Sequence, residues 1–148
     1  MPAVYTVSQS ARIAAPSCRV YGILADYHRG HPRILPPAFF GLTVERGGVG
    51  EGTLISFQMR AFGRTRQARA EITEPKPGRV LREAYLDDGG TVTTFTVNPV
   101  QNDCEVTIAT ELRHRGGLLG KLEQFLSTRY LLPIYREELA LLEQVAKG

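Results

Sequence analysis

A proline separates the first strand pattern of this chain from its first helical pattern. Residues 4–13 contain Val, Tyr and Thr in partial two-residue alternation, which predicts a β-strand. Pro16 has a fixed φ and no backbone N–H to donate, so it suits the first turn of a helix that runs to Asp26. Almost everything that follows is strand and turn, until one long helical pattern closes the chain. This order predicts a sheet curled around a terminal helix.

The first helix is short, and a segment rich in His and Pro follows it. Val20, Ile23 and Leu24 form the apolar face of this helix. Residues 27–37 can hold one short helical turn at most, because the Pro pair at the end of this segment cannot continue a helix. We therefore expect two short helices after the first strand.

Later segments have the alternation or composition of β-strands. In the best of them, Ile55, Phe57 and Met59 share one side of the strand and polar residues share the other. Short turns between such segments favour an antiparallel meander. The segments are residues 40–45, 53–62, 65–74, 80–86, 91–97 and 104–112. The expected turns include Gly63-Arg64, residues 75–78 and residues 98–103.

The closing helix is predicted over residues 118–146, where apolar side chains recur at steps of three and four. Pro133 lies inside it, removes one backbone donor and crowds the carbonyl of Arg129. One kinked helix is favoured because the apolar stripe continues in phase across Pro133, and a helix broken at Leu132 is the competing interpretation. The stripe runs through Leu118, Leu122, Phe125, Arg129, Leu132, Tyr135, Leu139, Leu142 and Ala146.

Length and charge restrict the class of protein. A chain of 148 residues fits one domain, here residues 1–148. The formal net charge of +3 is mildly basic, and the densest group of Arg side chains is interpreted as a solvated hairpin, so no nucleic-acid partner is predicted. That group is Arg60, Arg64, Arg66 and Arg69. No segment has the pattern of a signal peptide or the roughly 20 apolar residues that cross a membrane.

The order of elements and three short motifs resemble the START-like or Bet v 1-like superfamily (SRPBCC), and within it the polyketide cyclase/dehydrase and lipid-transport group. The motifs are Ile13-x-Ala15-Pro16, Val20-Tyr21-x-x-Leu24-x-Asp26 and Gly50-x-Gly52-Thr53. The resemblance covers essentially the whole chain. It implies an α+β helix-grip fold, in which an antiparallel sheet of about seven strands wraps a long C-terminal helix and encloses a cavity.

A cavity between sheet and helix is also expected from the residues themselves, because Phe57 and Met59 stand beside the small Ala68 and Ala70. A tightly packed core is the alternative. Within the resemblance, members bind lipids, sterols, polyketides, quinones or plant hormones; some are enzymes and one branch activates a chaperone. The predicted wall of the cavity consists of Ile55, Phe57, Met59, Glu83, Tyr85, Phe95, Leu122, Phe125, Leu126, Arg129 and Tyr130.

The predicted function is binding of a hydrophobic small molecule, such as a lipid or polyketide, for transport or sensing. A cyclase or dehydratase acting in the same cavity is one alternative, and a protein-interaction module of the chaperone-activator kind is another. The enzyme would need a titratable group deep inside the cavity. The interaction module would have a filled core and an exposed apolar patch. The sequence leaves a monomer and a homodimer open.

Arg129 is the polar exception on the apolar stripe. A buried Arg needs a partner, and Glu83, Glu111 or a ligand carboxylate could provide it. In that arrangement Arg129 would anchor an acidic ligand, with Tyr130 or Tyr135 beside it. Alternatively, the side chain extends along its aliphatic stem to solvent.

The remaining reactive residues do not assemble into a known motif. Asp26, His28 and His31 fall within six residues and are interpreted as a polar mouth of the cavity, because no further ligand completes a metal site. Cys18 has no readable base beside it and is interpreted as a structural thiol. Cys18 and Cys104 form no metal-type pair, so free thiols and a cytoplasmic location are expected. Neither a metal nor a cofactor is predicted.

Overall fold

The computed structural model describes residues 3–87 and 89–148. Its strands form a seven-stranded sheet in the order β1-β7-β6-β5-β4-β3-β2, and every neighbouring pair is antiparallel. The strands are β1 (Ala3–Ile13), β2 (Phe39–Arg46), β3 (Leu54–Ala61), β4 (Arg64–Lys76), β5 (Val80–Tyr85), β6 (Val92–Val100) and β7 (Asp103–His114). The helices are α1 (Ser17–Ala25), the short 3-10 helix η1 (His31–Ile34) and α2 (Gly117–Lys147).

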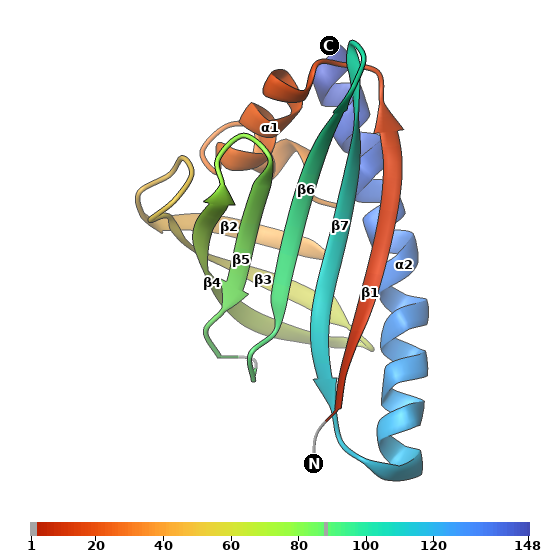
Figure 1. Ribbon diagram of the computed structural model, residues 1–148. Helices are drawn as coiled ribbons and strands as arrows, with labels where there is room; N and C mark the ends of the chain where they lie inside the picture. Colours follow the sequence, from red (N-terminus) through yellow and green to blue (C-terminus); the bar gives the residue numbers. More distant parts are fainter. Residues whose placement is uncertain (1–2, 88) are drawn as a thin grey trace.

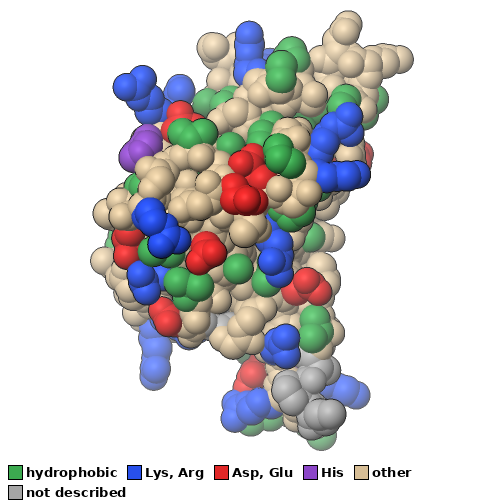
Figure 2. All heavy atoms as spheres, turned by 60° about the vertical axis from the view of Figure 1, so that its left-hand side comes forward, with side chains coloured by type: hydrophobic (Ala, Val, Ile, Leu, Met, Phe, Trp, Pro, Cys, Tyr) green, Lys and Arg blue, Asp and Glu red, His purple; other side chains and the backbone are tan. Residues whose placement is uncertain are grey.

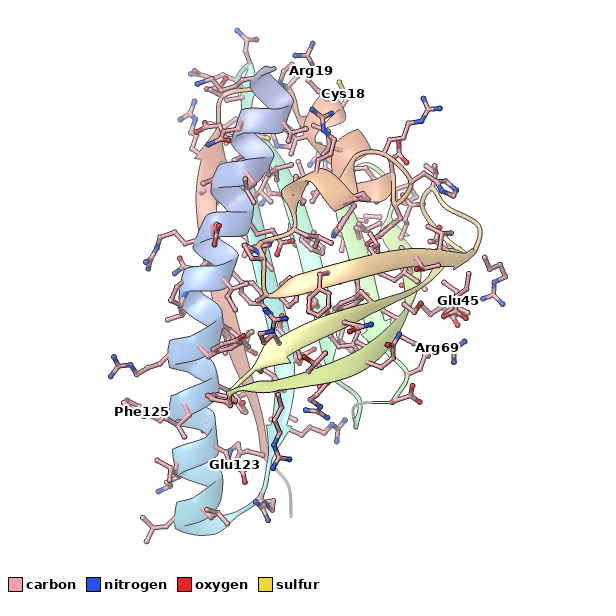
Figure 3. All side chains as sticks on the ribbon, turned by 180° about the vertical axis from the view of Figure 1, so that it is seen from behind. Cys18, Arg19, Glu45, Arg69, Glu123 and Phe125 are labelled. Atoms are coloured by element: carbon pink, nitrogen blue, oxygen red, sulfur yellow. The ribbon has the colours of Figure 1, made fainter. Side chains whose placement is uncertain are left out.

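The sheet is strongly curled, so that β2, β3 and β4 cross β1, β6 and β7 at a steep angle (Figure 1). The first strand closes this arrangement, because β1 pairs along its whole length with β7, from Ala3 opposite His114 to Ile13 opposite Cys104. The long helix α2 runs along β1 on the inner side of the sheet, and α1 and η1 cover the end where the chain terminates (Figures 1 and 3). This is the helix-grip arrangement that the sequence predicts.

Both predicted short helices are present. Helix α1 begins directly after Pro16 and buries Val20 and Leu24. The segment after it forms the single turn of η1. Helix α2 is one continuous helix with Pro133 inside it, so the broken-helix alternative is wrong. Pro133 is exposed, and its missing donor therefore falls on the solvent side of the helix.

Three predicted turns are shifted or shortened. The β3–β4 hairpin turns at Phe62 and Gly63, one residue earlier than predicted, and both have positive φ, as a two-residue hairpin loop of the primed type requires. β4 continues through Pro75, where its pairing with β5 shifts in register. β6 continues through Pro99, which pairs with Cys104 of β7 beyond the last β5 partner at Thr96. A proline is tolerated there because its ring faces no neighbouring strand.

The alternation of β3 and β4 divides their arginines between the outer face of the sheet and the cavity side. Arg69 lies on the outer face and forms two hydrogen bonds of 3.0 Å with the Glu45 carboxylate, while Arg60 lies over the ring of Phe40. Arg64 and Arg66 line the cavity side instead. Basic and acidic side chains are interspersed on the face seen in Figure 2. The four arginines therefore do not share one face.

Glycine is needed where α2 begins. A Cβ on Gly120 would lie 1.5 Å from the carbonyl oxygen of Arg115, so only glycine allows the preceding loop to fold back onto the first turn of the helix. No helix within the described ranges is long and apolar enough to cross a membrane.

Candidate functional site: a cavity with a buried acidic end

A cavity of about 740 Å³ lies between the curled sheet and the middle of α2. Apolar side chains from five elements form much of its wall, among them Tyr5, Phe39, Met59, Leu112 and Leu131. Charged and polar side chains stand around it as well, namely Arg64, Arg66, Asp87, Arg113, His114 and Glu123. A wall of this kind suits a largely apolar ligand with a few polar groups.

A second, narrow space of about 30 Å³ continues the cavity inward, toward α1 and η1. Phe39, Tyr85 and Tyr135 belong to the walls of both spaces, so they mark the passage between them. Its volume is of the order needed for one water molecule or one small polar group. We call this narrow space the inner end of the cavity.

Glu83 lies at the inner end with two partners from the α1–η1 region. It comes from the cavity side of β5, and its exposed fraction is 5%. The Tyr27 hydroxyl donates a hydrogen bond of 2.7 Å to Glu83 Oε2, and His31 Nε2 lies 3.6 Å from the same oxygen. Burial, followed by the charge of Glu83, raises the pKa of Tyr27 well above its ordinary value, so Tyr27 stays a donor.

The tautomer of His31 follows from its other nitrogen. His31 Nδ1 lies 2.7 Å from the carbonyl oxygen of Leu24, which can only accept, so Nδ1 carries the proton. Nε2 therefore faces Glu83, either as a bare nitrogen or as the second N–H of an imidazolium. The ring stacks on Tyr27 at 4.4 Å and meets Phe95 edge-on. These contacts fix His31 in the floor of the cavity.

Glu138 is the second carboxyl at the inner end. It comes from α2, its exposed fraction is 3%, and burial together with the charge of Glu83 raises its pKa well above the ordinary value. No hydrogen bond to the Glu138 carboxyl is found within the described part of the chain. Every side-chain N or O atom there that is fully shielded from solvent does have a partner. The Glu138 oxygens therefore border open space in the cavity that they line. A protonated Glu138 presents an O–H donor to that space.

Hydroxyl groups line the passage between the two spaces. Tyr135 of α2 is hydrogen-bonded to Thr110, which is bonded in turn to Thr93 at 2.8 Å. Tyr85 also interacts with Thr93, and its burial raises its pKa well above the ordinary value. These hydroxyl groups are neutral at physiological pH, so Glu83 and Glu138 are the acidic groups of the inner end among the described residues.

Seven of the predicted wall residues border one of the two spaces, and their contact with a ligand stays a prediction. Ile55, Phe57, Glu83, Tyr85 and Phe95 border the inner end. Met59 and Tyr130 border the larger space, and the Tyr130 hydroxyl donates to the carbonyl of Arg60.

The other four predicted wall residues are corrected by the structure. Leu122, Phe125 and Leu126 have exposed fractions of 52%, 55% and 43%, and Arg129 is exposed with its guanidinium over the Phe125 ring at 5.7 Å. None of the four lies in the wall of the cavity. Apolar periodicity identifies one face of a helix but not the body that this face meets. Arg129 therefore cannot anchor a ligand in the cavity, and Glu83 pairs with Tyr27 and His31 instead.

The acidic and His-rich segment after α1 does not form a polar mouth. Asp26 accepts hydrogen bonds from the backbone N–H groups of His28 and Arg29, and His28 is exposed beside the carbonyl of Gly47. His31 is buried, and it lies at the inner end of the cavity. Among the described residues no group of three or more His, Cys, Asp or Glu side chains is placed to hold a metal ion.

Comparison with known proteins assigns the sequence to a family. A sequence model described as "Polyketide cyclase / dehydrase and lipid transport" matches residues 5–147. No curated protein matches the chain. Among solved structures, the solution structure of KanY protein has a TM-score of 0.87 and 24% sequence identity, with 99% of each chain covered.

Two plant proteins show the same architecture. Norcoclaurine synthase from Thalictrum flavum, solved in complex with dopamine and hydroxybenzaldehyde, has a TM-score of 0.72 and 15% identity over 97% of this chain and 87% of its own. The major latex-like protein 151 from Panax ginseng has a TM-score of 0.72 and 12% identity over 98% of this chain and 99% of its own. At these identities the likeness establishes the shared Bet v 1-like helix-grip fold.

Proposed function

The chain belongs to the polyketide cyclase/dehydrase and lipid transport family, and from this premise we propose that it binds a hydrophobic small molecule in its cavity as a carrier or sensor. The observation that carries the proposal is the open space of about 740 Å³ between sheet and helix. A protein-interaction module would instead have a filled core without such a space. We expect this binding to take place in the cytoplasm.

The floor of the cavity defines the polarity of the ligand. Two buried carboxyls, Glu83 and Glu138, lie at the inner end, and its lining contains no Lys or Arg among the described residues. A ligand carboxylate at this end would add a third acidic group in a poorly solvated space. A neutral carbonyl or hydroxyl group would instead accept the O–H of protonated Glu138. The proposed ligand is therefore an apolar molecule with a neutral oxygen at its buried end.

Binding can be measured with N-phenyl-1-naphthylamine, a neutral apolar fluorophore. We expect saturable binding at one site per chain, with the enhanced fluorescence of a probe removed from water. The neutral ketone 2-acetylnaphthalene should displace the probe at lower concentration than 2-naphthoate, which has the same ring system but a carboxylate. Absence of saturable binding would contradict the proposed function, whereas stronger displacement by 2-naphthoate would contradict the assigned polarity of the floor.

Acid–base catalysis in the same cavity is a second candidate function, and the unpartnered Glu138 carboxyl favours it. An acid that stays protonated in a buried site can donate its proton to a ketone oxygen. If the Glu83 carboxylate takes a proton from the carbon next to that carbonyl, the C–H bond breaks, a C=C bond forms and the ketone becomes its enol. The two carboxyls then have opposite roles, because Glu138 donates a proton to the ketone oxygen while Glu83 accepts one from carbon.

Enolisation can be followed by deuterium exchange. In D₂O the methyl protons of 2-acetylnaphthalene should be replaced by deuterium faster with the protein than in buffer, and NMR measures their loss. Glu138→Gln should return the exchange rate to that of buffer while the variant still binds N-phenyl-1-naphthylamine. Binding of the ketone without any faster exchange would leave the carrier and exclude this catalytic role.

A further inference from the structure

The N-terminal half of α2 has its apolar side toward solvent. Large apolar side chains there are between 43% and 88% exposed. They are Leu118, Leu119, Leu122, Phe125 and Leu126, which we call the α2 apolar face. At 100° per residue these five fall on one arc of the helix, whereas Gly120 and Leu131 lie buried on the opposite arc. Figure 3 shows Phe125 pointing away from the sheet.

We propose that the α2 apolar face docks on the surface of a bilayer that contains anionic lipids. An exposed cluster of large apolar side chains on one helix marks an interaction surface. A helix with such a face and basic neighbours lies in the membrane interface with its apolar side among the acyl chains. The charges around the face, the geometry of Arg129 and the position of the cavity support this occupant.

The segment that carries the α2 apolar face has a basic excess. Residues 113–129 contain four Lys or Arg and one acidic residue, a net charge of +3, which equals the formal net charge of the whole chain. The remaining residues are therefore neutral in sum. The basic residues are Arg113, Arg115, Lys121 and Arg129, and the acidic residue Glu123 pairs with Arg115. Anionic lipid headgroups complement this excess.

The side chain of Arg129 has the arrangement expected at a lipid interface. Its guanidinium lies 5.7 Å from the centre of the Phe125 ring, so its aliphatic stem extends over the apolar face. A long cationic side chain of this kind can keep its charge among phosphates while the ring beside it enters the acyl region. Arg129, the polar exception on the apolar stripe, would thus reach the headgroups.

A second copy of the chain is a poorer occupant. A symmetric dimer through this face would bring two segments of net charge +3 together, and the one acidic side chain of each is already paired with Arg115. Such like charges repel across an interface. The charges therefore favour an anionic surface over self-association.

The proposed docking face adjoins the cavity. Tyr130, at the edge of the apolar arc, and Ser127, beyond it on the same helical turns, line the larger space. Phe62 lines it as well and is 63% exposed. The rings of Phe62 and Tyr130 are 5.1 Å apart. Docking through this face would bring that part of the cavity wall to the bilayer, where hydrophobic ligands dissolve. This use of the site depends on the proposed function, but the docking itself does not.

Vesicle co-sedimentation tests the docking. The wild-type chain should sediment with phosphatidylcholine vesicles that contain phosphatidylglycerol, less at high salt, and far less with phosphatidylcholine alone. Replacing Leu122 and Phe125 together by Ser should abolish sedimentation. Replacing Lys121 and Arg129 by Gln should lower the affinity about thirtyfold, since two surface cations are removed. Val49→Ser, at an exposed apolar residue away from α2, is the matched control and should bind like wild type.

Light scattering during size-exclusion chromatography separates the outcomes. A dimer that Phe125→Ser converts to a monomer, without vesicle binding, would show that the face is a self-interface and would overturn the proposal. Unchanged sedimentation of the Leu122 and Phe125 variant would overturn it as well. All variants change exposed residues and should keep the binding of N-phenyl-1-naphthylamine, so the docking and the proposed function can fail separately.

Discussion

Glu138→Gln is expected to raise the stability of the protein at neutral pH and to change it little near pH 4.5. In the folded chain burial and the charge of Glu83 raise the pKa of Glu138 well above 4.5, whereas in the unfolded chain the carboxyl titrates near that value. Above about pH 4.5 the unfolded chain therefore releases a proton that the folded chain retains, and stability falls as pH rises toward the folded pKa. Gln removes this loss.

The size of the gain should be about 1–3 kcal/mol at neutral pH, as for a buried polar group relieved of an unsatisfied state. Urea unfolding of both proteins near the two pH values measures it. Glu137→Gln is the matched control, because Glu137 is the preceding residue of α2 and is exposed. An equal effect of Glu138→Gln at both pH values would show that folding does not raise the pKa of Glu138. A loss of stability at neutral pH would show that the folded chain stabilises its carboxylate.

Ala61→Trp should close the cavity and lower the affinity for N-phenyl-1-naphthylamine by about tenfold to a hundredfold. Ala61 ends β3 and lies half-buried in the wall of the larger space, so an indole there would occupy volume that the ligand needs. Steric overlap of this kind typically costs about 1–3 kcal/mol. The ring would enter an open cavity and not a packed core, so the thermal unfolding midpoint should change little. Fluorescence titration gives the affinity.

Ala140→Trp provides the comparison for this variant. Ala140 is exposed on α2, so the same substitution adds a Trp without reaching the cavity, and binding should stay at the wild-type value. If folded Ala61→Trp bound the probe as tightly as wild type, the probe would occupy another site, and the larger space would not be the binding cavity.

Much of the fold follows from local patterns in the sequence. Alternation identified the strands because one side of a curled sheet faces the core and the other faces water. The ends of β4 and β6 were harder to predict, because Pro75 and Pro99 normally interrupt strands. Whether a proline is tolerated depends on which neighbouring strand is absent at that point, and local sequence does not contain this information.

The inner end of the cavity was only half predictable. Glu83 and Tyr85 share the cavity side of β5 through their alternation, but the partners of Glu83 lie far away in sequence, at Tyr27 and His31. Glu138 was missed because a charged residue beside an apolar stripe is usually solvated. Its position three residues after Tyr135, on the same side of the helix, was the available signal.

The exposed half of α2 shows the limit of periodicity. Leu122 and Tyr135 belong to one stripe in the sequence, yet Tyr135 is 5% exposed and Leu122 is 52% exposed. The stripe continues in phase, but the helix face that meets the sheet changes along α2. Only tertiary structure decides which part of an apolar stripe is covered.

The pairing of β1 with β7 also determines when the fold can form. Residues 3–13 pair with residues 104–114. During synthesis β1 therefore emerges long before β7, the strand with which it forms its backbone hydrogen bonds. Closing so long a loop is entropically unfavourable, and sheets built on distant contacts fold in milliseconds to seconds and not in microseconds. During synthesis, β1 would therefore expose its unpaired edge until β7 had emerged. Throughout this interval the edge could pair with other chains and start aggregation.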